Sequence, residues 1–325
     1  MPSTHNKAPH NKNSSQNMPF LRRVRKDAVT NLLRAGMHAS QRGSADGVHF
    51  LQGVALTAVK TCVPLRIRLA RNMKAVGIYR RGLVDRHFER AADQLGFLMR
   101  IFQAGFPGSG VGKEWRFDES FQNLQDAYDA QRGVLIIAPH LCGYPVLPPV
   151  LTQRLPCSIY LRRSADPRKH EINKAIGQAG GGHLVYPPAN ATRAQRLNVA
   201  LQILRERRML YLTPDLLRKP DKGTPVTIFG RQVYFPTGVP IMAMRTGALV
   251  VMVFWHYQDG QYHIRFHEAM DLSGRIDRRR RAAKCMSRFA TLMDECLREQ
   301  PELWWNWLDK RWTWTLRGQM TYPTG

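Results

Sequence analysis

A histidine follows a strongly apolar run at residues 134–140, "VLIIAPH", and small residues and prolines come after it. A short apolar run bounded by turn residues predicts a buried strand. His140 then lies at the carboxyl end of that strand, the edge at which open α/β sheets bind ligands. Two interpretations stay open: His140 is a general base that deprotonates a hydroxyl or an amine, or it is the last polar residue of a buried strand.

Other polar side chains follow other predicted strands. Asp215 comes after "LYLTP", and Arg162 and Arg163 come directly after "SIYL". Because the carboxyl ends of parallel strands meet at one edge of a sheet, we expect the histidine, the acid and the two arginines to converge there. The arginines would bind an anionic substrate, such as a phosphate or a phosphopantetheine.

Motifs for several other chemistries are missing. The chain has no GxSxG nucleophile elbow and no GxxxxGK[ST] phosphate loop, and its three glycines at 180–182 precede a strand rather than a helix. The histidines and the five cysteines show neither zinc-site spacing nor an HExxH motif. We therefore predict no metal site and no bound cofactor, and the odd number of cysteines favours a reducing compartment.

Strands that alternate with helices must position these residues. Four short apolar runs predict strands at 133–139, 157–163, 181–188 and 209–215. Helical segments are predicted at 85–104 (with Asp85 as a cap), 118–130, 168–179, 192–208 (with Thr192 as N-cap) and 276–299. Residues 224–238 alternate around Gly230-Arg231 and predict a hairpin or two short strands, and the clearest hairpin is predicted at 248–270, turning at Asp259-Gly260. The pattern predicts an α/β fold with a mostly parallel central sheet, flanking helices and an antiparallel hairpin.

The chain is strongly basic, with a formal net charge of +25 over 325 residues. Such an excess predicts an anionic partner: nucleic acid, a phospholipid surface or a phosphorylated substrate. No nucleic-acid recognition motif is present, so we do not expect nucleic acid as the partner. We predict a single α/β domain over 46–325, preceded at 1–45 by a basic arm that is largely disordered or loosely helical.

No stretch reaches the roughly 18–20 apolar residues needed to span a bilayer. Residues 48–63 form either a core helix or a helix in a membrane interface, and the basic amphipathic residues 65–81 either rest on anionic lipid or form a solvated surface helix. The tryptophans at 304–314 are either core or interfacial, and partial core is favoured.

Four blocks between residues 133 and 312 carry a family resemblance, which covers roughly residues 65–312. They read "GVLIIAPHLCGYP" (133–145), "CSIYLRR" (157–163), an Asp-containing block at 210–254 in which Thr237-Gly238 starts a helix, and "QPELWWNWLDKRW" (300–312). In their order and spacing these blocks resemble the lysophospholipid acyltransferase superfamily, and within it the lipid A biosynthesis lauroyl/myristoyl acyltransferases.

The resemblance implies an acyltransferase that moves a fatty acyl group from an acyl carrier protein or coenzyme A thioester to a hydroxyl or amine of a lipid-like acceptor. It implies peripheral attachment to the anionic cytoplasmic face of a bacterial inner membrane. His140 would deprotonate the acceptor. The substrate-binding residues implied are Arg162, Arg163, Gly143, Thr237 and Gly238. Acyl carrier proteins are acidic, so a basic surface would favour their docking.

The chain departs from the family at one position. The defining motif is a histidine followed after four residues by Asp or Glu, and Pro145 stands at the acid's place. No Asp or Glu occurs between Asp129 and Asp166. Three hypotheses follow: Asp215 or another distant acid replaces the missing carboxylate, His140 acts alone, or the protein is a non-catalytic lipid- or acyl-carrier-binding protein.

Overall fold

The computed structural model describes residues 31, 34–43, 53, 57, 61–160, 164, 166–181, 183–188, 190–274 and 277–319. Within the arm predicted at 1–45, residues 34–42 are helical. Of the segment predicted at 48–63, residues 53, 57 and 61–63 are described, and Arg162 and Arg163 lie outside the described residues. The expectations for these parts of the chain therefore stay predictions.

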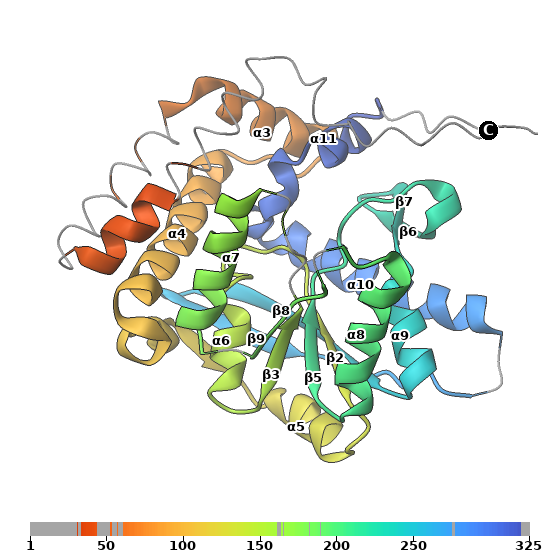
Figure 1. Ribbon diagram of the computed structural model, residues 1–325. Coiled ribbons are helices and arrows are strands. Elements are labelled where there is room, and N and C mark those ends of the chain that lie inside the picture. The colour runs from red at the N-terminus through yellow and green to blue at the C-terminus, as the bar shows by residue number, and fades with distance from the viewer. Residues whose placement is uncertain are drawn as a thin grey trace, which may run out of the picture.

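A seven-stranded sheet forms the centre of the fold (Figure 1). Its strands follow the order β1-β9-β8-β2-β5-β3-β4, and every neighbouring pair is parallel except β8 and β9. The strands are β1 (Trp115–Phe117), β2 (Val134–Ile137), β3 (Cys157–Tyr160), β4 (His183–Val185), β5 (Met209–Leu212), β8 (Leu249–Gln258) and β9 (Gln261–Phe266). The predicted α/β class, with its mostly parallel sheet, is confirmed.

Helices flank this sheet and connect its parallel strands (Figure 1). The α-helices are α3 (Val63–Ala75), α4 (Leu83–Gly108), α5 (Phe121–Asp129), α6 (Leu147–Thr152), α7 (Pro167–Ala179), α8 (Arg193–Arg205), α9 (Gly238–Thr246), α10 (Arg278–Glu299) and α11 (Lys310–Leu316). Short 3₁₀ helices are η1 (Val111–Glu114), η2 (Pro220–Lys222), η3 (Pro301–Leu303) and η4 (Trp305–Leu308). Among the described residues, no helix combines the length and the apolar character that crossing a bilayer requires.

Both predicted hairpins are present. Strands β6 (Gly223–Ile228) and β7 (Arg231–Pro236) form a separate antiparallel pair. In the β8–β9 turn, Asp259 and Gly260 have φ values of 50° and 80°, the positive values that a type I′ turn requires at both central residues. This explains why Asp-Gly was a reliable turn signal.

Local capping explains where two helices start. At α8, the Thr192 hydroxyl accepts from the Gln195 N–H at 3.2 Å and the Gln195 side chain accepts from the Thr192 N–H at 2.7 Å, so the predicted N-cap is confirmed as a capping box. The prediction for Asp85 is wrong, because α4 already begins after Gly82. Asp85 lies in the first turn and pairs with Arg66.

The core lies around the central strands. All four residues of β2 are buried, and so are the first seven residues of β8. Such continuous apolar runs are typical of strands that are covered on both faces.

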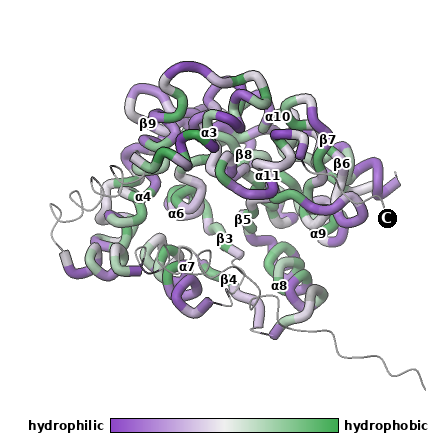
Figure 2. The backbone as a smooth tube through the Cα atoms, turned by 90° about the horizontal axis from the view of Figure 1, so that it is seen from above, coloured by the Kyte–Doolittle hydropathy of each residue, from purple (hydrophilic) through white to green (hydrophobic). Residues whose placement is uncertain are grey.

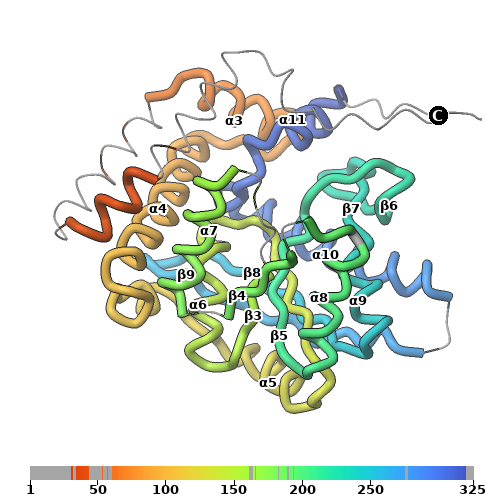
Figure 3. Tube along the Cα trace, viewed as in Figure 1, coloured from red at the N-terminus to blue at the C-terminus, as the bar shows by residue number. Residues whose placement is uncertain are grey.

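Helices α3 and α11, which are far apart in the sequence, lie side by side in Figures 1 and 2, and residue contacts between them agree. Figure 3 shows the chain returning to this region after α10.

Candidate active site

His140 lies three residues beyond β2, at the carboxyl edge of the sheet. The turn that carries His140 is hydrogen-bonded to residues 301–316 near the C-terminus, which we call the closing segment. The Trp305 N–H donates to the His140 carbonyl at 2.8 Å, and the Cys142 N–H donates to the Leu303 carbonyl at 2.5 Å. These backbone bonds fix the position of His140 from outside its own strand.

Asp215 follows β5, the parallel neighbour of β2, and therefore reaches the same edge. The Nδ1 atom of His140 forms a hydrogen bond with Oδ1 of Asp215. The backbone N–H of His140 donates to Oδ2 of the same carboxylate at 3.0 Å. The two residues lie 75 positions apart in the chain, and the parallel pairing of their strands brings them together.

The closing segment supplies three more donors to Asp215. Trp304 Nε1 donates to Oδ2 at 3.1 Å, and Asn306 Nδ2 donates to the same oxygen at 2.9 Å. Trp312 Nε1 donates to the backbone carbonyl of Asp215 at 3.0 Å. A buried carboxylate requires such donors, because it has lost its water shell.

These contacts decide the protonation state of Asp215, which has no exposed surface. Burial alone raises the pKa of this carboxyl, but the charge of His140 and hydrogen bonds from His140 and Trp304 outweigh it. The net pKa of Asp215 lies below its ordinary value of 3.8. Asp215 is therefore a carboxylate at neutral pH and holds the imidazole by Nδ1.

The other ring nitrogen of His140 points toward a hydroxyl. Thr213 Oγ1 lies 3.1 Å from Nε2 of His140. The ring of Tyr144 meets the imidazole in an edge-to-face contact, with the ring centroids 4.8 Å apart. Burial and the charge of Asp215 raise the pKa of Tyr144 to about 12, so its hydroxyl stays protonated at neutral pH.

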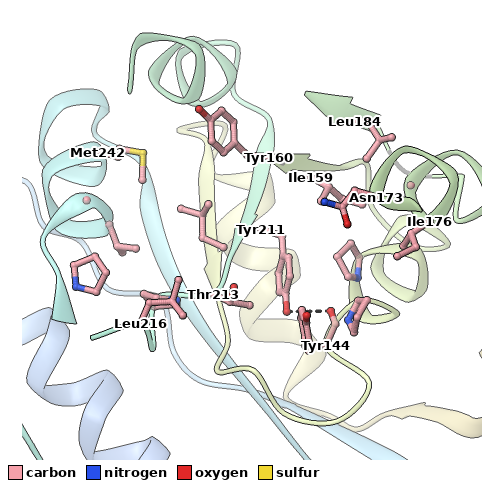
Figure 4. A pocket seen from close by; sticks show the side chains of 18 of the residues that line it. Tyr144, Ile159, Tyr160, Asn173, Ile176, Leu184, Tyr211, Thr213, Leu216 and Met242 are labelled. Atoms are coloured by element: carbon pink, nitrogen blue, oxygen red, sulfur yellow. Dashed lines mark hydrogen bonds between the residues drawn. The ribbon is translucent and has the colours of Figure 1, made fainter. Parts of the chain in front are cut away.

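A cavity of about 350 Å³ lies next to this cluster, and both Thr213 and Tyr144 line it (Figure 4). The cavity wall is mainly apolar and comes from β3, α7, β4, β5 and α9; it includes Ile159, Ile176, Leu184, Leu212, Val239 and Met242. Figure 4 shows Ile159, Ile176 and Leu184 on one side of an open space and Met242 on the other. An apolar cavity with a few polar groups at one end is the usual form of a ligand site.

The predicted site residues divide into three groups. His140 and Asp215 are brought together, and Gly238 lines the cavity where Thr237 begins α9. Gly143 does not line the cavity: its N–H donates to Gln94, and a Cβ at this position would meet the ring of Trp115. Arg162 and Arg163 lie outside the described residues, so their binding role stays a prediction.

Pro145, the residue at the place of the family's acid, also lines the cavity. A side chain at this position therefore faces the space in which a ligand would lie.

Burial raises the pKa of the nearby Cys142 thiol, which remains protonated and unreactive at neutral pH. Within the described residues, no cluster of histidine, cysteine and acidic side chains could hold a metal ion.

Sequence reasoning missed Thr213 and the three donors of the closing segment. Thr213 had a usable signal, because it lies two residues before Asp215 on the same strand end. The donors had a weaker one: the block at 300–312 was noted for its tryptophans, without a role for any of them. Three of these tryptophans, Trp304, Trp307 and Trp312, are fully buried, as partial core placement predicts.

Comparison with known protein families identifies one match. The model of the bacterial lipid A biosynthesis acyltransferase family matches residues 80–313, which is more than half of the chain. The match contains β2, β5 and the closing segment as far as Thr313, and so the whole cluster around Asp215. No curated protein matches the chain.

Proposed function

Because the chain belongs to the bacterial lipid A biosynthesis acyltransferase family, we propose that it transfers a fatty acyl group from a thioester to a hydroxyl or amine of a lipid-like acceptor. The observation that carries this proposal is the bond between His140 and the buried carboxylate of Asp215. Asp215 supplies the carboxylate that is missing at the family's motif position, where this chain has Pro145. A histidine that a carboxylate orients is a general base for hydroxyl groups.

In this mechanism Asp215 holds Nδ1, so Nε2 is free to take a proton. The acceptor oxygen attacks the thioester carbonyl as His140 removes its proton, and the sulfur leaves as a thiol when His140 returns that proton. The imidazolium that forms on the way is stabilised by the negative charge of Asp215. The apolar cavity holds the acyl chain, because its wall offers alkyl and aromatic groups.

The donor is an acyl carrier protein or coenzyme A thioester, and no resident cofactor is required. The net charge of +25 supports either donor, since acyl carrier proteins and the coenzyme are both anionic. Arg162 and Arg163 are proposed to bind the anionic part of the substrate, as their place after β3 suggests.

The chain is proposed to act on the cytoplasmic face of the inner membrane, as a peripheral protein. Helix α3 carries four cations and no acid, and Val63 and Ile67 on it are exposed. The exposed Trp314 lies on α11, which packs against α3, and the exposed Trp305 follows Trp304 at the active site. Exposed apolar side chains among cations are typical of a surface that rests on anionic lipid.

The proposal is tested by acyl transfer with purified protein and by mass spectrometry of lipid extracts. We expect His140→Ala to abolish transfer, because this variant lacks the base. We expect Asp215→Asn to lower kcat/KM by about a thousandfold, because this variant lacks the carboxylate that orients the base. His263→Ala changes a histidine of the β8–β9 hairpin and is the matched control.

Equal transfer by wild type and His140→Ala would exclude the mechanism. Lipid binding without transfer by the wild type, with any donor, would favour instead a non-catalytic lipid- or acyl-carrier-binding protein.

A further inference from the structure

The polar side chains that line the apolar cavity differ in whether the protein itself satisfies them. Tyr160 donates its hydroxyl to the carbonyl of Arg196 at 3.2 Å, and Tyr211 donates to the carbonyl of Tyr144 at the same distance. The hydroxyl of Thr213 contacts the imidazole of the base. These three side chains therefore face the cavity with their hydrogen bonds already made.

Asn173, on α7, also lines the cavity and is partly buried. Within the part of the chain that the structure describes, its side-chain amide forms no hydrogen bond. The Tyr144 hydroxyl forms none there either, but Tyr144 lies against the ring of His140, whereas Figure 4 shows Asn173 across the open space from Met242. An amide has two N–H donors and an oxygen acceptor, so Asn173 presents unused hydrogen-bonding capacity to the cavity.

The packing of α7 fixes the direction of this side chain. Asn173, Ile176 and Gly177 are spaced three and four residues apart and all line the cavity, so they share one face of the helix. A Cβ on Gly177 would lie 2.1 Å from a methyl carbon of Leu184 on β4, so this face packs closely on the sheet. Asn173 is the central residue of α7, and it is therefore held along the cavity wall rather than at a helix end.

An amide in this position distinguishes between two kinds of acyl chain. A plain alkyl chain bound in the cavity would displace water from Asn173 and offer no partner in return, which is unfavourable. A hydroxyl on the chain can accept from the amide N–H or donate to its oxygen, and so replaces the water. A site built to bond a substrate hydroxyl discriminates against the analogue that lacks it.

We propose that Asn173 determines acyl specificity and that the preferred donor carries a hydroxyl on its acyl chain. The inference rests on the proposed function, because it names the class of acyl group that the cavity holds. The chemistry of transfer is unchanged: the acceptor attacks the thioester directly with His140 as the base. The chain hydroxyl bonds Asn173 and takes no part in bond making or breaking.

The first test compares donors. Wild-type protein is given dodecanoyl-coenzyme A together with its monohydroxylated isomers, with the hydroxyl at each carbon from the second to the eleventh, or the same acyl groups on acyl carrier protein. The lipid extract of the transfer assay is the acceptor, and mass spectrometry measures the products. We expect kcat/KM for at least one hydroxylated isomer to exceed that for dodecanoyl by about tenfold.

The second test changes the amide. Asn173→Leu keeps a similar volume without hydrogen-bonding groups, and we expect it to lose the preference for the hydroxylated donor and to use the plain dodecanoyl donor better than wild type does. A variant that is merely damaged would not gain activity toward any donor. Gln178→Leu removes an exposed amide from the same helix and is the matched control, which should keep the wild-type preference. Thermal unfolding checks that both variants are folded.

Binding of free acids separates this inference from the proposed function. By calorimetry, the favoured hydroxydodecanoic acid should bind wild type about tenfold more tightly than dodecanoic acid, and Asn173→Leu should bind the two alike. This result without transfer from any donor would support the role of Asn173 and count against the acyltransferase. Transfer of plain and hydroxylated chains at equal rates would overturn the inference and leave the proposed function standing. A wild-type preference that Asn173→Leu retains would also overturn it.

Discussion

The carboxylate of Asp215 links the stability of the fold to pH. Its pKa is lower in the folded protein than the ordinary value of 3.8, because the charge and hydrogen bonds around it outweigh the effect of burial. A group with a lowered pKa stabilises the fold above its unfolded pKa, and the stabilisation is lost as the pH falls through the folded value. The relevant window therefore begins near pH 4 and extends downward.

We expect Asp215→Asn to reduce the acid sensitivity of stability in this window. One proton taken up on unfolding changes the free energy of unfolding by at most about 1.4 kcal/mol per pH unit. The slope for the wild type should exceed that of the variant by up to this amount between pH 4 and the folded pKa. Urea unfolding at a series of pH values measures both slopes. The same substitution at the exposed Asp221 is the control. Parallel slopes for wild type and Asp215→Asn would contradict the lowered pKa.

A second prediction concerns Gly143, which was expected to bind substrate. Its φ is +92°, and a Cβ there would lie 2.7 Å from the ring of Trp115. We expect Gly143→Ala to lower the free energy of unfolding by about 2 kcal/mol through backbone strain and crowding. Gly110→Ala also has a positive φ but open space around its Cβ, so it separates strain from crowding. Equal losses in the two variants, measured by urea unfolding, would show that the contact with Trp115 adds nothing.

The site residues differ in how far the sequence could predict them. Because parallel strands end at one edge, a histidine after one apolar run and an acid after another could be expected to meet, and His140 and Asp215 do. Asn306 could not be predicted in this way, since it reaches Asp215 from 91 residues away and belongs to no periodic pattern. Contacts made by an irregular segment depend on the folded path of the chain, which local spacing does not encode.

At the scale of elements, the closing segment holds the carboxylate of Asp215 in place through hydrogen bonds from Trp304 and Asn306. Trp304 and Trp307 are both fully buried, and their rings contact each other with centroids 4.9 Å apart. Only one of them donates to the carboxylate: Trp304 Nε1 reaches Asp215, whereas Trp307 Nε1 donates to the carbonyl of Pro301. This pair allows the hydrogen bond to be separated from the packing.

We expect Trp304→Phe to raise the pKa of Asp215 and to lower kcat/KM by about tenfold, because the carboxylate loses a donor worth about 1–3 kcal/mol. The onset of acid unfolding should move to higher pH by about one unit. Trp307→Phe loses a similar area of buried ring and should shift neither the onset nor the activity to the same extent. Identical pH profiles for the two variants would mean that the segment acts by packing alone.

The elements themselves follow from the sequence where their pattern is long enough. The apolar runs of β2, β5 and β8 and the Asp-Gly turn were sufficient, because each combines a period with a boundary signal. Strand β1 has no counterpart among the predicted strands, since three residues show no period. It exists through tertiary contacts: Trp115 pairs with Tyr262 of β9, and their rings stack at 4.8 Å.

At the scale of the whole molecule, cations and exposed apolar side chains occur together on α3 and on α11, which packs against it. The large apolar side chains exposed in the described part of the chain are Val63, Ile67, Tyr79, Leu216, Trp305 and Trp314. They lie on or next to α3, on the closing segment, or directly after Asp215. The pKa of Arg317 is lowered by burial and further by the nearby charges of Arg68 and Arg71, so these cations repel one another. An anionic surface would relieve that repulsion.

We therefore expect this face, and not the basic run at 278–281, to bind lipid. Reversing Arg68 and Arg71 together, to Glu, should weaken binding to vesicles of phosphatidylglycerol and phosphatidylcholine at least tenfold, since each cation near an anionic surface contributes about 1 kcal/mol. Arg278→Glu with Arg279→Glu changes the net charge by the same amount at the N-terminal end of α10, where acids are favourable because they lie in the first turn of the helix. That control should bind nearly as the wild type does. Vesicle cosedimentation at several salt concentrations makes the comparison, and an equal loss in both double variants would show that net charge, rather than the face formed by α3 and α11, attracts the protein to the membrane.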